Sequence, residues 1–388
     1  MNKQWTQRAA DIDSFKVMDL LKRAKELDAE GHDVVHMVAG EPDFATAGPV
    51  AAAAISAIDN GLTQYTPAAG IPELRAKISQ WYQSRYGLNI SPERIIVTPG
   101  ASGALLMVFS LLADPGRTFM MGDPGYPCNR QFLRLIEARG QLVPCSMQDN
   151  FQLTPEAIRE HWKPETAGVL LASPANPTGS VVHKDDLRNI AETVKALGGN
   201  LVVDELYHGL TYGFEANSVL EVDPDAFVIN SFSKYFGMTG WRLGWMVAPE
   251  SAVPELEKLA QNLFISPPTV AQHAALAAFE PESLAIFEQR RQAFQERRDL
   301  LVSGLRDLGF DIPVTPEGAF YVYAGASHLT DNTFDYCWSL LEEDKLATTP
   351  GIDFGTYRAN EFIRFSYTTG LDRIELALER LHKRIQGA

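Results

Sequence analysis

The feature that most constrains the fold is a series of short apolar runs that alternate with stretches of helical periodicity. The runs show little polar–apolar alternation, and several end in glycine, proline or an acidic residue. Such runs are typical of strands covered on both faces, and strand–helix alternation is typical of a mostly parallel sheet. The sequence therefore predicts an α/β fold with strands at 95–97, 118–121, 168–172, 201–203, 226–229 and 244–247.

Helical spacing and the usual start and stop residues predict the remaining elements. In the first third of the chain we expect helices at 15–30, 50–59, 72–86 and 103–112, and a strand at 34–38. After Pro267 and Pro268 the pattern changes to one long helix rich in arginine, glutamate and glutamine, followed by a mixture of strands and helices. These later elements are expected at 282–308, 319–323, 334–343, 362–365 and from 371 onward.

The length of the chain indicates two domains. Its 388 residues are too many for one simple core. We expect a large domain over 46–280 that contains the parallel sheet covered by helices. A smaller α+β domain is expected to join 1–45 to 281–388.

The charge balance argues against nucleic acid as a partner. The chain has 34 basic and 49 acidic residues, a net charge of −15 at pH 7, and no basic cluster. Nucleic-acid-binding domains usually carry such a cluster. Anionic substrates would have to be held by individual arginines against the overall field.

Cysteine use and hydropathy predict a cytoplasmic protein. Cys128, Cys145 and Cys337 show neither CxxC spacing nor an even framework, which suits a reducing compartment. Residues 1–14 mix charged and polar side chains without the apolar stretch of a secretion signal. No apolar run approaches the ~18 residues of a membrane span.

The richest stretch for chemistry is residues 230–234, Asn-Ser-Phe-Ser-Lys, which follows the predicted strand at 226–229. A lysine held at a rigid strand end can be desolvated and become a neutral nucleophile, as a Schiff-base lysine requires. Arg242 follows Lys234 by eight positions and is flanked by glycines, so backbone can approach whatever it holds. The alternative for Lys234 is an ordinary solvated surface lysine.

Three further turns lie at strand ends, where ligands of α/β sheets bind. Residues 98–104 are small and open a helix, so their free amides suit a phosphate. Tyr126 stands between prolines and a glycine as a rigid surface for stacking on a ring. Asn176 offers a donor and an acceptor in a loop whose Asn-Pro bond can be cis. Each of these is also compatible with a plain turn.

Two charged residues complete the set. Asp204 follows three aliphatic residues, and a carboxylate there is costly to bury without a cation. A protonated ring nitrogen is a better partner than a metal, since no His/Asp ligand spacing supports a metal site. Arg364 lies in an aromatic strand and suits a carboxylate, although it can also be an edge-strand arginine that reaches solvent. One cofactor requires all these features together, pyridoxal 5′-phosphate.

These motifs together resemble the fold-type I pyridoxal-phosphate aminotransferases of the class I/II group. The resemblance runs from Gly40-Glu41-Pro42-Asp43 to Arg364, and its most specific part is Ser-x-Ser-Lys followed by Gly-x-x-Gly-Trp-Arg-x-Gly. It implies a sheet of the seven-stranded type. It also implies that the enzyme transfers the amino group of an L-amino acid to a 2-oxo acid, such as 2-oxoglutarate or pyruvate, with ping-pong kinetics.

The resemblance also implies roles for individual residues. Lys234 would form the Schiff base and move the proton, Asp204 would pair with the ring nitrogen, and Tyr207 would hydrogen-bond the ring oxygen. Arg364 would bind the substrate carboxylate, and Tyr65 would reach the phosphate of a neighbouring subunit, which implies a homodimer with shared active sites. The remaining implied residues are Ala101, Ser102, Tyr126, Asn176, Ser231 and Arg242 for the cofactor, and Gly40 with Asn176 for the substrate.

The substrate is less well specified. Asp353 stands where small residues are commoner in the family, and no second arginine for a side-chain carboxylate is evident. Phe15, Phe320 and Tyr321 would make the pocket apolar, which favours neutral or aromatic amino acids.

Three other functions are alternatives to amino-group transfer. The first is a β-lyase acting on a sulfur amino acid on the same scaffold. The second is a regulator that senses the cofactor, which is disfavoured because there is no basic DNA-binding segment. The third, a nicotinamide enzyme, is disfavoured because no GxGxxG follows a first strand.

Overall fold

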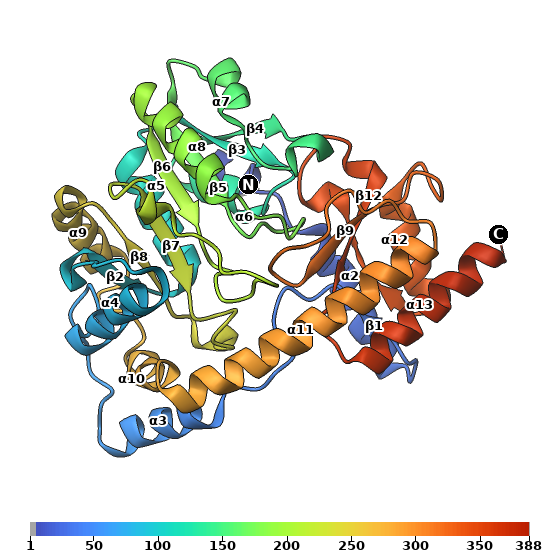
Figure 1. The fold of residues 1–388 in the computed structure, drawn as a ribbon, viewed down its shortest axis with the longest axis horizontal. Coiled ribbons are helices and arrows are strands. Elements are labelled where there is room, and N and C mark those ends of the chain that lie inside the picture. Colours follow the sequence, from blue (N-terminus) through green and yellow to red (C-terminus); the bar gives the residue numbers. More distant parts are fainter. Residues whose placement is uncertain (1–4, 388) are drawn as a thin grey trace.

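The computed structural model describes residues 5–387, and its centre is a seven-stranded sheet (Figure 1). Five neighbouring strands, β7, β6, β5, β3 and β4, are parallel, whereas β8 runs antiparallel to both β7 and β2. The predicted mostly parallel α/β sheet is therefore confirmed. Its strands, in spatial order, are β2 (Ile95–Thr98), β8 (Gly244–Val247), β7 (Phe227–Ser231), β6 (Asn200–Asp204), β5 (Thr166–Ala172), β3 (Thr118–Asp123) and β4 (Arg139–Pro144).

The sheet has a separate apolar core on each face, because successive strand residues point to opposite sides. Leu170 and Val202 pack in one core, and their neighbours Leu171 and Val203 pack in the other. Both cores are covered by helices, which explains why the strand sequences lack alternation. The covering helices are α4 (Pro72–Tyr86), α5 (Gly100–Leu112), α6 (Cys128–Leu135), α7 (Pro155–His161), α8 (Lys184–Ala196), α9 (Val253–Leu263) and α10 (Thr269–Ala278), with α3 (Gly48–Asp59) packed on α10.

The sequence did not predict β4. Its residues, Arg-Gly-Gln-Leu-Val-Pro, are mostly polar or half-exposed because β4 lies at the edge of the sheet. Edge strands tolerate proline and polar side chains, so they lack the apolar run of a central strand. The strand expected at 319–323 is shifted to β9 (Tyr321–Gly325), since Ala319 has a φ of 60°, which no strand residue adopts.

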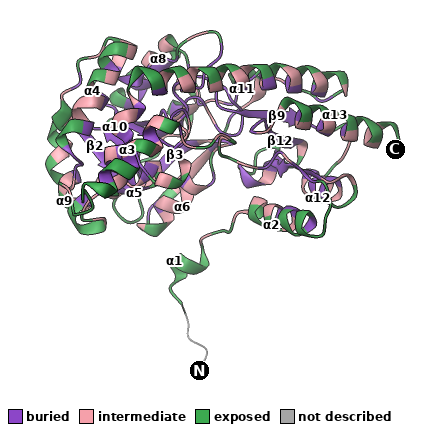
Figure 2. Cartoon of the chain, turned by 90° about the horizontal axis from the view of Figure 1, so that it is seen from below, coloured by how far each residue is buried: buried purple, intermediate pink, exposed green. Residues whose placement is uncertain are grey.

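The C-terminal part forms a second layer of structure. Strands β11 (Thr349–Pro350), β12 (Phe362–Ser366) and β9 form an antiparallel sheet, and β1 (Val35–His36) pairs in parallel with β10 (Leu346–Ala347). Helix α11 (Pro281–Asp307) runs from the large sheet to this part and lies beside α13 in Figure 2. The other helices here are α2 (Lys16–Ala29), α12 (Thr333–Asp344) and α13 (Leu371–Gln386).

The N-terminal segment packs with this second part, as α2 contacts α12, β10 and β11. Preceding α2, the short helix α1 (Gln7–Ala10) projects from the body (Figure 2). On these contacts we propose the division into 46–280 and 1–45 with 281–388. Residues 1–4 and 388 of those ranges lie outside the described residues. Residues 1–4 are also part of the stretch 1–14, which is expected to lack a secretion signal.

Two kinds of feature are absent from residues 5–387. No helix there is both long and apolar enough to cross a membrane. No group of three or more His, Cys, Asp or Glu side chains in that range is arranged to hold a metal ion.

Candidate active site

A cavity of about 460 Å³ opens at the carboxyl ends of β5, β6 and β7. The start of α5, the first turns of α2 and Arg364 of β12 complete its wall. All the predicted site residues except Tyr65 line this cavity: Gly40, Ala101, Ser102, Tyr126, Asn176, Asp204, Tyr207, Ser231, Lys234, Arg242 and Arg364.

Lys234 follows β7 and its ammonium group lies inside the cavity. Its Nζ donates to the carbonyl of Gly40 at 2.5 Å and lies 5.9 Å from the ring centroid of Tyr207. Burial lowers the pKa of Lys234 to about 8, an effect that Glu41 opposes and Arg242 reinforces. Near pH 8 about half of the molecules thus carry the neutral amine that a nucleophile or proton acceptor requires.

Asp204 is the last residue of β6 and is only 6% exposed. In the described part of the chain its Oδ1 accepts a hydrogen bond from the amide of Leu206 at 3.1 Å. Burial raises the pKa of Asp204 to about 7. A buried carboxyl that lines a cavity with so little compensation fits a cationic N–H ligand, such as a protonated ring nitrogen.

Another part of the site is formed where the start of α5 closely approaches Arg242. Gly100, the first residue of α5, has a φ of +73°, and a Cβ on it would lie 2.6 Å from Nη2 of Arg242. Arg242 itself has a φ of 53° and donates to the carbonyl of Thr239 at 2.9 Å. The free amides at the start of α5, the Ser231 hydroxyl and this guanidinium together fit a phosphate.

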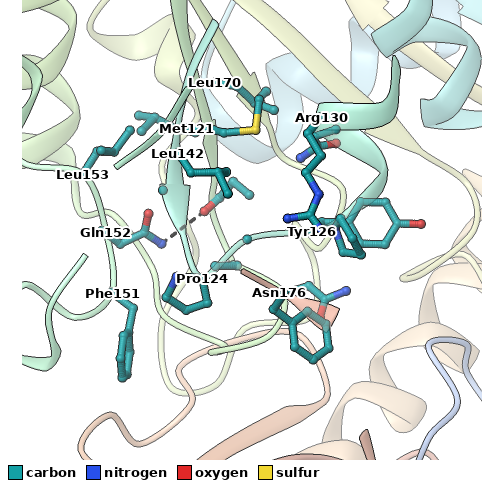
Figure 3. A pocket seen from close by; sticks show the side chains of 18 residues that line it. Met121, Pro124, Tyr126, Arg130, Leu142, Phe151, Gln152, Leu153, Leu170 and Asn176 are labelled. Atoms are coloured by element: carbon teal, nitrogen blue, oxygen red, sulfur yellow. Dashed lines mark hydrogen bonds between the residues drawn. The ribbon is translucent and has the colours of Figure 1, made fainter. Parts of the chain in front are cut away.

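Tyr126 separates the large cavity from a smaller one of about 40 Å³, which Figure 3 shows from close by. Tyr126 and Asn176 line both cavities, and the Tyr126 ring centroid lies 6.4 Å from that of Phe15. The Asn176-Pro177 bond is cis, as the sequence allowed. The amide of Gly125 donates to the carbonyl of Phe354 at 2.8 Å, which fixes the loop that carries Tyr126.

Arg364 is almost fully buried without a carboxylate among its described hydrogen-bond partners. Its guanidinium donates to Asn176 Oδ1 at 3.0 Å, to the carbonyl of Val38 at 2.8 Å and to Thr349 Oγ1 at 3.2 Å, while Nε has no partner. The ring of Tyr321 lies 4.4 Å from its Cζ. A buried arginine in this state fits an anionic ligand such as a carboxylate.

Two expectations about aromatic residues differ from the structure. Phe15 and Tyr321 line the cavity, but Phe320, which lies in the turn before β9, does not. Phe320 instead packs against Tyr207, with ring centroids 5.4 Å apart. Tyr65 is 80% exposed on the surface of its own chain, so the structure of one chain does not bring it to this cavity.

Sequence reasoning missed part of the cavity wall. Ser233 and Thr239 also line the cavity. They lie within residues 230–242, but the sequence pattern alone suggests no role for them. The first turns of α2 were recognised only as an amphipathic helix. An apolar face on an N-terminal helix signals that it is covered, but not by what.

Comparisons with known proteins agree with this geometry. The family model for "Aminotransferase class I and II" matches residues 32–381. A valine–pyruvate aminotransferase of Mycobacterium tuberculosis is 39% identical over 96% of both chains. An aspartate aminotransferase of Geobacillus stearothermophilus is 35% identical over 97% of this chain and 98% of its own.

Solved structures extend the similarity to the fold. A crystal structure of an aminotransferase from Mycobacterium tuberculosis superposes with a TM-score of 0.96 at 37% identity, covering all of both chains. A double mutant of the aspartate aminotransferase of Thermus thermophilus gives 0.93 at 34% identity, covering 99% of this chain and all of its own. The similarity therefore extends over the whole fold.

Proposed function

The chain belongs to the class I and II aminotransferase family, whose members depend on pyridoxal 5′-phosphate, and from this premise we propose how it works. It is an aminotransferase. The proposed reaction moves the amino group of an L-amino acid to 2-oxoglutarate or pyruvate in ping-pong order. The observation that carries the proposal is that Lys234, Asp204 and Arg364 line one cavity.

Asp204 and the phosphate-binding residues would fix the two ends of the cofactor. When bound, pyridoxal phosphate supplies an aldehyde that combines with amines and a ring that withdraws electrons. Asp204 would hold the ring nitrogen protonated. The phosphate would be held by the amides of Ala101 and Ser102, the Ser231 hydroxyl and Arg242.

Aromatic and amide groups would orient the ring. Tyr126 would stack on it, and Tyr207 and Asn176 would hydrogen-bond its oxygen. The Tyr207 hydroxyl lies 2.9 Å from that of Tyr321, and Asn176 already accepts from Arg364. These contacts hold both side chains in place before a ligand arrives, so little ordering entropy is lost on binding.

Lys234 is the proposed Schiff-base lysine. Its lowered pKa makes the neutral amine available. This amine would first anchor the cofactor, and it would then take a proton from the substrate Cα and donate that proton to a different atom. Arg364, with Asn176 and the backbone of Gly40, would bind the substrate carboxylate and so present the Cα–H bond to Lys234. The hydrogen bond from Lys234 to the carbonyl of Gly40 supports this arrangement.

An exposed apolar patch supports a homodimer. Large side chains on α3 and on the segment after it are exposed: Ile55, Ile58, Leu62 and Tyr65. Patches of this kind usually mark protein interfaces. Tyr65 lies within the patch, so a second copy that covers it can receive this tyrosine near its phosphate site. A cytoplasmic location stays a prediction from the three unpaired cysteines.

Lys234→Ala tests the reaction assignment. The variant should lose the absorbance of covalently bound cofactor and at least about 10²- to 10⁴-fold in turnover, because both anchor and proton acceptor are gone. Lys258→Ala, at an exposed lysine of α9, is the matched control and should keep both. Transamination by Lys234→Ala at the wild-type rate would contradict the assignment. Ammonia release from a sulfur amino acid without an added oxo acid would instead identify the β-lyase reaction.

A further inference from the structure

Asp353 connects the N-terminal helix to the wall of the cavity. It ends the 3-10 turn Gly351–Asp353 and is only 5% exposed. Its Oδ1 accepts from the amide of Lys16 at 3.0 Å and its Oδ2 from the amide of Val17 at 2.7 Å. Both carboxylate oxygens are therefore used on the first turn of α2.

The first turn of α2 has no cap of its own. Phe15 occupies the N-cap position and makes no side-chain hydrogen bond there. The first amides of a helix lack intrahelical partners and carry the positive end of the helix dipole, so a carboxylate is a favourable acceptor. Since Asp353 supplies this cap from a distant part of the chain, it sets where α2 begins in space.

The docked helix forms an apolar side of the cavity. Phe15, Val17, Met18 and Leu21 all line it. Each of them depends on the position of the α2 first turns, and the Phe15 ring reaches Tyr126 on the opposite loop. A shift of this turn would therefore move the surface that a substrate side chain contacts.

The segment around Asp353 also contacts Arg364. The Phe354 ring lies 4.8 Å from the Arg364 Cζ, and Thr349 accepts from its guanidinium at 3.2 Å. The segment that contains Asp353 thus contacts both α2 and the arginine expected to bind the substrate carboxylate. This places the two recognition elements at a set separation.

The charges around the cavity disfavour a second carboxylate on the substrate. The acidic residue Asp353 lines the cavity, and the arginines that line it are Arg242 and Arg364, which face phosphate and α-carboxylate in the proposed function. Lys25 of α2 also lines the cavity but is exposed to solvent. A hydrated lysine gives little net attraction to a carboxylate.

We propose that Asp353 is a positioning residue that docks α2 over the cavity and thereby selects amino acids with uncharged, apolar side chains. The statement about substrates rests on the proposed aminotransferase function. The statement about docking concerns this chain alone.

Hydrogen–deuterium exchange of the holoenzyme tests the docking. In Asp353→Ala the amides of residues 16 and 17 should exchange at least about tenfold faster than in the wild type, because they lose a charged acceptor. Asp353→Asn keeps the volume but has one acceptor oxygen, so its exchange should lie between the two. Asp19→Asn removes an exposed carboxylate from the same helix and should exchange like the wild type.

Half-reaction kinetics with L-leucine and L-aspartate test the selection. The wild type should prefer L-leucine, and Asp353→Ala should lower the ratio of the two specificity constants at least about tenfold. The loss should appear in the apparent Kd for L-leucine more than in the limiting rate, because the wall binds the side chain and does not touch the Cα proton. Asp19→Asn should keep the wild-type ratio.

The outcomes separate the two proposals. Unchanged exchange at residues 16 and 17 in Asp353→Ala overturns the docking, and a wild-type preference for L-aspartate or an unchanged ratio overturns the selection. A wild-type protein that transfers no amino group from any amino acid overturns the proposed function. The exchange measurement still decides in that case whether Asp353 holds α2.

Discussion

At the scale of single residues, burial shifts the two central ionisable groups towards their neutral forms. Burial raises the pKa of Asp204 to about 7 and lowers that of Lys234 to about 8. Asp204 is the last residue of β6, and Lys234 lies in the turn that follows β7, so the same strands that stabilise the sheet also help to remove water from the two groups. A reactive amine near neutral pH is thus a consequence of the fold.

The stability of the cofactor-free protein should reflect Asp204. The pKa of Asp204 is near 3.8 in the unfolded chain and about 7 in the folded protein. Asp204 therefore stabilises the folded protein fully below about pH 4, and this stabilisation is lost as the pH rises through 7. Three pH units correspond to at most about 4 kcal/mol. The Asp204→Asn variant should not show this loss of stability. The free energy of unfolding of the variant minus that of the wild type should therefore rise between pH 4 and 7.

Thermal or denaturant unfolding of both proteins across that pH range gives the measurement. Glu205 is buried beside Asp204, and burial is the main cause that raises its pKa to about 8, so it adds the same trend to both proteins and most of its contribution cancels in the difference. The Asp204 charge adds a smaller rise to the pKa of Glu205, which the variant lacks. Parallel pH profiles for wild type and variant would show that Asp204 is not the titrating group.

At the scale of elements, the site depends on where strands end and helices begin. The turn from β2 to α5 shows this most clearly, because Gly100 must adopt a positive φ and leave room for Arg242. An alanine there would combine backbone strain with a collision against the guanidinium. The same turn presents the free amides of α5 to the cavity.

Gly100→Ala should therefore weaken binding of pyridoxal phosphate by at least about tenfold, or about 1.4 kcal/mol. Gly116→Ala is the matched control, since Gly116 also has a positive φ of +82° but has nothing within 4 Å of the added carbon. Equilibrium dialysis with the cofactor and a parallel unfolding experiment separate the two effects. Equal loss of affinity in both variants would attribute the effect to backbone strain.

At the scale of the whole molecule, one chain leaves two features unexplained. The apolar patch around α3 is exposed, and Tyr65 does not line the cavity of its own chain. A homodimer accounts for both, because a second copy would cover the patch and receive Tyr65. The prediction concerns assembly and cofactor binding together.

Ile58→Asp should dissociate this dimer. Ile58 is 57% exposed on α3, and a carboxylate buried there without a partner should cost about 3 kcal/mol or more. Sedimentation velocity should show a shift to monomer, accompanied by weaker cofactor binding. Leu371→Asp makes the same change at an exposed leucine of α13 and should leave assembly intact. A fully dimeric Ile58→Asp protein would place the interface elsewhere.

Much of this organisation could be predicted from local sequence. The apolar runs before Ser231, Asp204 and Thr98 predicted strands covered on both faces, and the polar residue at each end predicted a ligand site. These features depend on neighbours along the chain, so spacing alone reveals them. The family resemblance, and with it the aminotransferase assignment, came from the same short motifs and is confirmed by the comparisons.

The tertiary structure decided what depends on distant contacts. The sequence of β4 is polar and half-exposed because this strand lies at the edge of the sheet, and Phe320 packs against Tyr207 without lining the cavity. Asp353 stood out in the sequence only as an unusual residue, because its partners Lys16 and Val17 lie more than 330 positions away. Sequence spacing determines which residues follow a strand, whereas only folding brings together side chains that share no local pattern.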